Sequence, residues 1–211
     1  CSLPTPQELQ EMRLSLGPAL ALRSPTSSAM MPAHPEYVFV TEREGAVWAW
    51  RGVGGGSAQP QRLFESGASS ASAAEGLYSI AFHPDFERTG ALFTLASSRQ
   101  CAEGPVCVVL SRWLTQASPQ SPPELPFSVL PNSEERLLEV PYAEALSLRG
   151  ALAFSREGDL YVSLGGGGPL EETGAEGAGS SLRASLKGSV LRLNIDEPSQ
   201  ACGTAYSVPP T

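Results

Sequence analysis

Two segments of the chain repeat one pattern, and this repeat constrains the fold more than any other feature. LYSIAFHPDFERTGALFTLAS, residues 77–97, has a short apolar strand that ends in Phe82, a polar turn with a glycine, and a second strand of leucine, aromatic and β-branched residues. LRGALAFSREGDLYVSLGG, residues 148–166, has the same order, and its first strand ends in Phe154. Repeated units of this kind predict a radial β architecture, in which similar sheets pack face to face around an axis.

Other segments supply further strands separated by turn-forming residues. Residues 37–41 and 46–50 are apolar runs on either side of a glycine-containing turn, which predicts a β-hairpin. RLFES, residues 62–66, predicts a short strand, and LKGSVLRLNID, residues 186–196, predicts another. GASSASAAEG, residues 67–76, is a low-complexity linker without core-forming side chains. The chain is therefore expected to consist almost entirely of short strands.

The composition agrees with an all-β fold. Apolar residues make up 41% of the 211 residues and charged residues 17%, while 21 glycines and 19 prolines leave few helix-length runs. A propeller blade of four antiparallel strands needs about 40–45 residues, so the chain has room for three or four blades. Because each blade buries its faces against its neighbours, part of a ring is expected to expose apolar surface. We divide the chain into a lead-in, residues 1–31, and an incomplete propeller, residues 32–211.

Charge and hydropathy argue against two classes of partner. The formal net charge of −8 disfavours a nucleic-acid-binding surface and is more compatible with a cationic or metal-bearing partner. No stretch approaches the ~20 apolar residues of a membrane-spanning helix. The chain opens on Cys1 without a recognisable signal peptide, so it is expected to be a processed chain or an excised piece. The alternative is a lipid-modified N-terminal cysteine.

The four cysteines predict a disulfide rather than a metal site. Cys101 and Cys107 bracket the turn AEGPV between two expected strands. A disulfide that closes this hairpin implies an oxidising compartment, and the alternative is a pair of reduced, buried thiols. The sequence has no C-x-x-C pair and only two histidines, so no zinc site is expected. Cys1 and Cys202 either pair with each other or with cysteines outside this chain.

Three segments resemble one enzyme superfamily in the same order along the chain. EGLYSIAFHPDFERTGALFTLAS, GDLYVSLGGGG and LKGSVLRLNID are similar to three motifs of the PQQ-dependent glucose/sorbosone dehydrogenases. Within that superfamily, FVTEREGAVWAW, GSVLRLNID, and Cys202 followed by YSVPP resemble the Hedgehog-interacting-protein branch. The resemblance implies a secreted six-bladed propeller flanked by cysteine-rich domains. This chain would be a partial six-bladed propeller, its N-terminal half, with about three to four blades of four-stranded antiparallel sheets.

The same resemblance identifies the catalytic positions, and this sequence departs from the family there. In the dehydrogenases a His-x-Gly-Gly sequence precedes the first strand of the second motif, and its histidine takes the proton of the sugar hydroxyl as hydride passes to PQQ. Here Ser147 stands at the histidine position and Arg149 at the first glycine. Gly166 replaces the family's aspartate, and Glu75 stands where a glutamine is common. A serine hydroxyl does not accept a proton at neutral pH without its own base, so no catalytic residue and no PQQ or Ca²⁺ cofactor is expected.

A long acidic loop is the candidate binding element. It is the segment GGGGPLEETGAEGAGSS, residues 165–181. In the Hedgehog-interacting branch the loop at this place carries a carboxylate that reaches the zinc ion of the Hedgehog ligand, so the resemblance points to Glu171, Glu172 and Glu176. The other interpretation is a solvated acidic loop without a ligand. The glycines lack the G-K-[ST] sequence of a phosphate-binding loop.

These observations leave three hypotheses about function. The first is a non-catalytic, secreted propeller segment that binds an extracellular, Hedgehog-like protein. The alternative is a PQQ-dependent aldose dehydrogenase that needs PQQ and Ca²⁺. The third is a partial or decayed product without activity. His83, in AFHPDF, is expected to be structural, because it lies in a turn before a strand and has no second ligand nearby in sequence.

Overall fold

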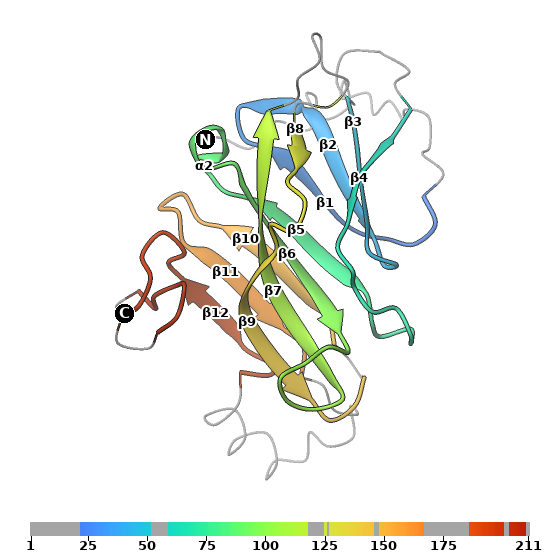
Figure 1. The fold of residues 1–211 in the computed structure, drawn as a ribbon, viewed down its shortest axis with the longest axis vertical. Helices are drawn as coiled ribbons and strands as arrows, with labels where there is room; N and C mark the ends of the chain where they lie inside the picture. Colours follow the sequence, from blue (N-terminus) through green and yellow to red (C-terminus); the bar gives the residue numbers. More distant parts are fainter. Residues whose placement is uncertain are drawn as a thin grey trace, which may run out of the picture.

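The described part of the chain forms three antiparallel β-sheets. The structure, a computed structural model, describes residues 22–51, 59–117, 125, 127–145, 148–166, 186–200 and 203–209. Within them, consecutive strands of the chain pair almost throughout, so each sheet is built from one continuous stretch of sequence. The all-β partial propeller predicted from the sequence is confirmed, with three sheets in the described residues (Figure 1).

The first sheet confirms the predicted hairpin and adds a strand that the sequence did not predict. The expected hairpin pairs Val38 with Trp50 and Val40 with Trp48. The first strand of the chain, β1, pairs with β2, although it lies within residues 1–31, which were predicted to be a lead-in to the propeller. In its sequence, PTSSAMM, only the last residue is fully buried. The strand therefore has no apolar alternation, and the sequence pattern did not predict it. The four strands are β1 (Pro25–Met31), β2 (His34–Glu42), β3 (Ala46–Arg51) and β4 (Gln61–Glu65).

The second sheet is the largest and carries the one short helix of the described residues. Its long strand β7 pairs with β6 on one side and with both β8 and β9 on the other. Helix α2 (Phe86–Thr89) lies in the turn between the first two strands and ends at Gly90, whose left-handed conformation suits glycine. No helix in the described residues is long and apolar enough to span a membrane. The strands are β5 (Leu77–Phe82), β6 (Ala91–Ser98), β7 (Val106–Ala117), β8 (Phe127–Val129) and β9 (Glu135–Tyr142).

The third sheet follows the second repeat of the sequence pattern. Strands β10 (Gly150–Phe154) and β11 (Leu160–Leu164) form the predicted hairpin, in which Leu152 pairs with Val162. Strand β12 (Val190–Leu193) pairs with β11 and places Leu193 beside Leu160. Leu152, Leu160, Val162 and Leu193 are all buried and face the second sheet.

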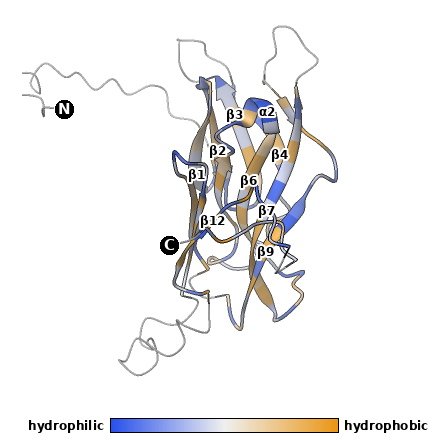
Figure 2. Ribbon diagram, turned by 90° about the vertical axis from the view of Figure 1, so that its left-hand side faces the viewer, coloured by the Kyte–Doolittle hydropathy of each residue, from blue (hydrophilic) through white to orange (hydrophobic). Residues whose placement is uncertain are grey.

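The first strands of the three sheets lie next to one another, as they do around a propeller axis. Strand β5 contacts β1 on one side and β10 on the other. One apolar cluster, which includes Phe39, Val47 and Leu92, fills the space between the first two sheets. A second cluster, which includes Phe93, Leu95 and Val162, fills the space between the second and third. Figure 2 shows hydrophobic residues along the strands, whereas the turn that contains α2 is mostly hydrophilic.

The outer faces of the first and third sheets expose apolar side chains. Met30 on β1 is 62% exposed, Tyr161 on β11 is 38% exposed, and Val190 on β12 is 67% exposed. Tyr161 lies between buried Leu160 and Val162, and Val190 pairs with Ser163, two residues further along β11, so both belong to the face that points away from the second sheet. This is the exposed apolar blade surface expected of part of a ring.

We predict that Gly150→Ala destabilises the fold. A Cβ atom at residue 150 would meet the carbonyl oxygen of Ser163 and lie 2.5 Å from Cδ2 of Leu95, at the contact between the second and third sheets. The expected loss in the free energy of unfolding is about 1–3 kcal/mol, measured by urea denaturation with tryptophan fluorescence.

The matched control is Gly166→Ala, because nothing lies within 4 Å of a Cβ atom built at that glycine. Its free energy of unfolding should stay within about 0.5 kcal/mol of the parent value. Equal stability of the two variants would contradict the close approach at Gly150.

Candidate functional site

A cavity of about 270 Å³ lies where the first strands of all three sheets meet. It opens at the end of the sheets where β5 and β10 begin, and this is the end at which β2 turns into β3. Residues from every sheet and from the linker before β5 therefore contribute to one site. The lining residues are Pro25, Thr26, Arg43, Ala73, Ala74, Glu75, Tyr78, Arg149 and Gly150.

Backbone hydrogen bonds between sheets hold Arg43 at the wall of this cavity. Its N–H donates to the carbonyl of Ser24 at 2.9 Å, and its carbonyl accepts from the N–H of Leu77 at 3.0 Å. A Cβ atom at Gly76 would collide with Cγ of Arg43 and lie 2.6 Å from its carbonyl oxygen. Gly76 has φ +150°, which L side chains rarely adopt, so glycine is needed here for both reasons.

Arg149 enters the cavity from the third sheet. The N–H of Gly165 donates to its carbonyl at 2.6 Å, which ties the start of β10 to the end of β11. The preceding residue, Leu148, is fully buried, whereas Arg149 is exposed. No hydrogen bond or ion pair of the Arg149 side chain occurs among the described residues. Arg149 therefore lines the cavity as an exposed cation.

Glu75 is a fully buried carboxylate held by a bidentate arginine. Nε of Arg99 donates to Oε2 at 3.0 Å, Nη2 donates to Oε1 at 2.6 Å, and the Ser69 hydroxyl also donates to Oε2. The Arg99 guanidinium, helped by the Ser69 hydroxyl, outweighs burial and lowers the pKa of Glu75 below its usual range. Both oxygens are thus engaged, and Glu75 is a structural anion with its charge neutralised.

Tyr78 supplies a neutral phenol to the same wall. Its hydroxyl donates to the carbonyl of Ala74 at 2.8 Å. Burial is the main cause that raises the pKa of Tyr78 to about 12, and the charge of Glu75 adds to the effect. The phenol therefore stays protonated at neutral pH and does not act as a base.

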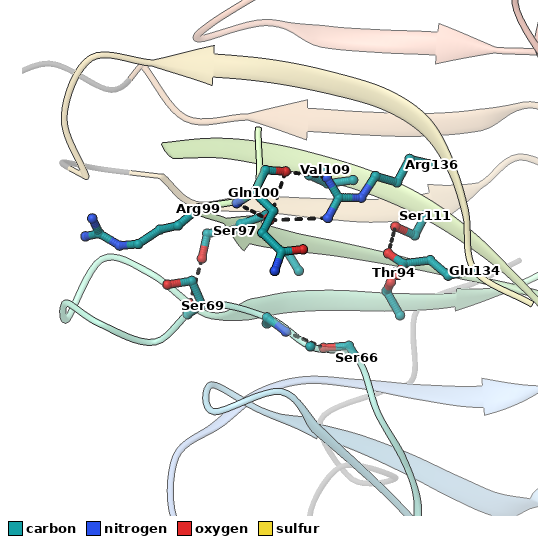
Figure 3. Close-up of a pocket in the computed structure, with 14 residues that line it drawn as sticks. Ser66, Ser69, Thr94, Ser97, Arg99, Gln100, Val109, Ser111, Glu134 and Arg136 are labelled. Atoms are coloured by element: carbon teal, nitrogen blue, oxygen red, sulfur yellow. Dashed lines mark hydrogen bonds between the residues drawn. The ribbon is translucent and has the colours of Figure 1, made fainter. Parts of the chain in front are cut away.

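A second, polar cleft of about 330 Å³ lies between the second sheet and the segment that follows β4. Its side chains bond mainly to one another: Ser97 donates to the carbonyl of Ser69 at 2.8 Å, Ser111 donates to Glu134 at 2.7 Å, and Arg136 donates to the carbonyl of Gln100 at 2.6 Å. Figure 3 shows these pairs, with Arg99 turned away from Gln100. The serine-rich linker, which the sequence analysis treated as featureless, thus forms one wall of a hydrogen-bonded cleft.

Of the positions at which the sequence departs from the family's catalytic residues, the structure describes Gly166 and Glu75. Ser147 lies outside the described residues, and Gly166 is exposed and offers no side chain. The chain has two histidines, and both lie away from the cavity. His34 is near Glu36 and Glu87, at 3.3 and 3.5 Å.

His83 is buried between the second and third sheets, which agrees with the structural role expected for it. Its Nδ1 accepts the N–H of Asp85 at 3.0 Å, and its Nε2 lies 3.3 Å from the Asp196 carboxylate. The ring packs edge-on against Phe154, with centroids 5.6 Å apart. All polar atoms of this imidazole therefore have partners within the fold.

The predicted binding loop can be located only by its ends. Glu171, Glu172 and Glu176 lie outside the described residues, as do Cys1 and Cys202. Gly165, the first residue of the loop, accepts hydrogen bonds from the Tyr142 hydroxyl at 2.8 Å and from the N–H of Gly188 at 3.2 Å. Gly165 and Gly188 therefore lie at the same end of the third sheet as Arg149, whose carbonyl accepts from the N–H of Gly165.

The predicted disulfide between Cys101 and Cys107 is confirmed, with Cα atoms 5.9 Å apart. It closes the hairpin between β6 and β7, next to Arg99. The Glu139 carboxylate lies near the two sulfur atoms, so that the three side chains have the spacing of a possible metal site. Because both sulfurs are bonded to each other, this group offers no thiolates to a metal ion.

We predict that Glu75→Gln lowers stability and flattens its dependence on pH. The folded pKa of Glu75 is below the unfolded value, so its stabilising effect is present above the unfolded pKa, about 4.3, and is lost as the pH falls through the folded pKa. At pH 7 the variant should lose about 1–3 kcal/mol in the free energy of unfolding. Below about pH 4 the difference should shrink, as followed by urea denaturation at several pH values.

The matched control is Glu65→Gln, which breaks the exposed pair of Glu65 with Arg62. An exposed pair contributes about 0–1 kcal/mol, so this variant should keep most of the stability of the parent. A pH dependence of Glu75→Gln equal to that of the parent would contradict the ionised, paired state of Glu75.

Relatives in sequence point to one family. A sequence model of the family described as Glucose / Sorbosone dehydrogenase matches residues 22–202. Hedgehog-interacting protein of Mus musculus is 29% identical over 194 residues, and that of Homo sapiens is also 29% identical over 194 residues. Each match covers 89% of this chain and 26% of the relative, so the chain spans about a quarter of their length.

Solved structures agree on the fold. The PQQ-bound form of aldose sugar dehydrogenase from Streptomyces coelicolor aligns with a TM-score of 0.62 and 23% identity, over 89% of this chain and 50% of that one. The soluble aldose sugar dehydrogenase from Escherichia coli aligns with a TM-score of 0.56 and 18% identity, over 88% of this chain and 51% of that one. At these identities the likeness establishes the fold, and this chain spans about half of each structure. Because the family match extends over residues 22–202, most of the sequence, this protein belongs to the Glucose / Sorbosone dehydrogenase family.

Proposed function

We propose that this chain is a non-catalytic, secreted propeller segment that binds an extracellular protein at the end of the sheets where the axial cavity opens. The observation that carries the proposal is the position of the two histidines. Both histidines are among the described residues, and neither of them lines the cavity. The family's proton acceptor is therefore missing from a scaffold that keeps the family's fold.

No other lining residue replaces the histidine as a base. The guanidinium groups of Arg43 and Arg149 are hydrogen-bond donors without an acceptor atom. Glu75 has both oxygens bonded to Arg99 and Ser69, and Tyr78 is held protonated by its raised pKa of about 12. General-base catalysis contributes about 10²–10⁴ in rate, so oxidation of a sugar hydroxyl would proceed poorly at this wall.

The described lining also fits the family's cofactors poorly. Calcium takes 6–8 oxygen ligands, many of them carboxylates. The one carboxylate among the described lining residues is Glu75, which is neutralised by Arg99. The chain carries glycine at residue 166, where the family has aspartate. These features support a site that binds neither PQQ nor Ca²⁺, so we assign neither of them a role in the function of this chain.

The disulfide supports an extracellular location. Disulfides form and persist in oxidising compartments, and Cys101–Cys107 closes a surface hairpin at the proposed binding end. Similarity to Hedgehog-interacting protein supports the same location and a Hedgehog-type ligand. The acidic segment with Glu171, Glu172 and Glu176 follows β11 in the chain and would provide the carboxylates that such a ligand's zinc ion would take.

The alternative function is a PQQ-dependent aldose dehydrogenase. The family match and the shared fold with a PQQ-bound aldose sugar dehydrogenase favour it. It would require a proton acceptor other than the residues that line the described cavity.

An activity assay separates the two functions. The chain is mixed with PQQ, Ca²⁺, glucose and a dye acceptor, with the Streptomyces coelicolor aldose sugar dehydrogenase as positive control. Because the cavity lacks an imidazole, dye reduction should not exceed that of a sample without protein. Turnover that scales with the concentration of this chain would overturn the non-catalytic proposal.

A binding measurement tests the partner. Zinc-loaded Hedgehog amino-terminal domain is immobilised, and this chain is applied in biolayer interferometry. Replacing Glu171, Glu172 and Glu176 together with glutamine should weaken binding about tenfold or more, because a charged contact contributes about 1.5–3 kcal/mol.

The control variant changes the same number of charges elsewhere, at the exposed glutamates Glu87, Glu157 and Glu197. It should bind like the parent chain. Absence of any binding, or equal binding by both triple variants, would contradict a Hedgehog-type ligand held by this loop.

A further inference from the structure

We infer that the axial cavity holds an acidic side chain of the bound partner, through the guanidinium groups of Arg149 and Arg43. The inference rests on the proposed binding function and identifies the chemistry of its anchor. Arg149 and Arg43 approach the cavity from the third and first sheets, so a carboxylate that enters along the axis meets a cation on either side.

The charge balance of the wall favours an anion. Glu75, the carboxylate among the lining residues, is neutralised by Arg99, which lies behind it. Arg43 makes one exposed contact, 3.3 Å from Glu44, which is weak by its length and exposure. Arg149 has no side-chain partner among the described residues. The cavity thus presents an excess of positive charge on a chain whose formal net charge is −8.

The backbone that carries each of the two cations is held in place before a ligand arrives. The backbone of Arg43 is bonded to Ser24 and Leu77 on two different sheets. The backbone of Arg149 is bonded to Gly165 and stands between buried Leu148 and tightly packed Gly150. A site on fixed backbone loses less entropy when it binds, so even a small carboxylate gains from it.

The chemistry matches a carboxylate well. A guanidinium offers parallel N–H donors that fit the two oxygens of a carboxylate. The protonated Tyr78 adds no negative charge at the wall. A volume of about 270 Å³ accepts the end of a glutamate or aspartate side chain.

The test uses the complete 211-residue chain and the peptide acetyl-Gly-Glu-Glu-Gly-amide, followed by isothermal titration calorimetry and by NMR of the peptide. Arg149→Gln and Arg43→Gln should each weaken peptide binding about tenfold or more, and Arg149→Lys should weaken it less. Sodium succinate should compete with the peptide, and raising NaCl from about 0.05 to about 0.5 M should weaken both ligands.

Two matched controls make the result specific. The peptide with glutamine in place of both glutamates should not bind. Arg156→Gln removes an exposed arginine from the β10–β11 turn, at the other end of the same sheet, and should bind like the parent. Circular dichroism and thermal melts check that every variant is folded.

The inference is overturned if the glutamate peptide does not bind, if the glutamine peptide binds equally well, or if Arg149→Gln binds like the parent. Succinate binding without peptide binding would also overturn it, because the cavity would then take a free carboxylate and not a protein side chain. Dye-linked turnover with PQQ would instead refute the non-catalytic proposal, so the two failures are distinguishable.

Discussion

Burial of the second sheet on both faces is the constraint on which the rest of the structure depends. Along β6, Leu92 and Ala96 face the first sheet, whereas Phe93 and Leu95 face the third. A strand that is buried on both faces has no alternation of polar and apolar residues. Its position is fixed by the two neighbouring sheets together. The first and third sheets each have one such contact, and their other faces expose Met30, Tyr161 and Val190. The radial order of the sheets follows, since each sheet is stabilised mainly by its neighbours.

The same packing brings three chain segments together at the axis. Thr26, Tyr78 and Gly150 belong to the first strand of each sheet, and they share one cavity. The apolar clusters extend to this end, where Leu77 and Leu148 are buried next to the lining residues Tyr78 and Arg149. Core residues and lining residues are therefore neighbours in the chain at the cavity.

The buried Glu75 shows how polar residues stabilise this end. A single buried carboxylate would be costly, but Arg99 and Ser69 satisfy both of its oxygens. The pair links the linker before β5 to the end of β6, and the disulfide closes the hairpin that follows. The ion pair and the disulfide thus stabilise the cavity wall on the side of the second sheet, and Arg149 lines the cavity from the third.

Local pattern determined the hairpins, the turn residues and the family. The β2–β3 and β10–β11 hairpins followed from apolar runs around glycine-containing turns, and the Cys101–Cys107 disulfide followed from a short loop between two strands. Strand β1 was missed because its residues are mostly exposed, and a strand at the margin of a sheet needs no apolar alternation. The sequence did not predict that one end of β7 pairs with β8 and the other end with β9. This pairing depends on which strands the loops place next to β7, and a local pattern does not contain that information.

The sequence by itself determined the all-β class, the order of the motifs and the presence of serine at residue 147, because each is written in contiguous residues. Only the tertiary structure decided that Glu75 is neutralised by Arg99, and that Arg43 and Arg149 share one cavity. These residues are far apart in the chain, and their charges interact only after the sheets pack around the axis. The physical reason is that electrostatic interactions depend on distance and burial in the folded protein, and a linear pattern of residues contains neither.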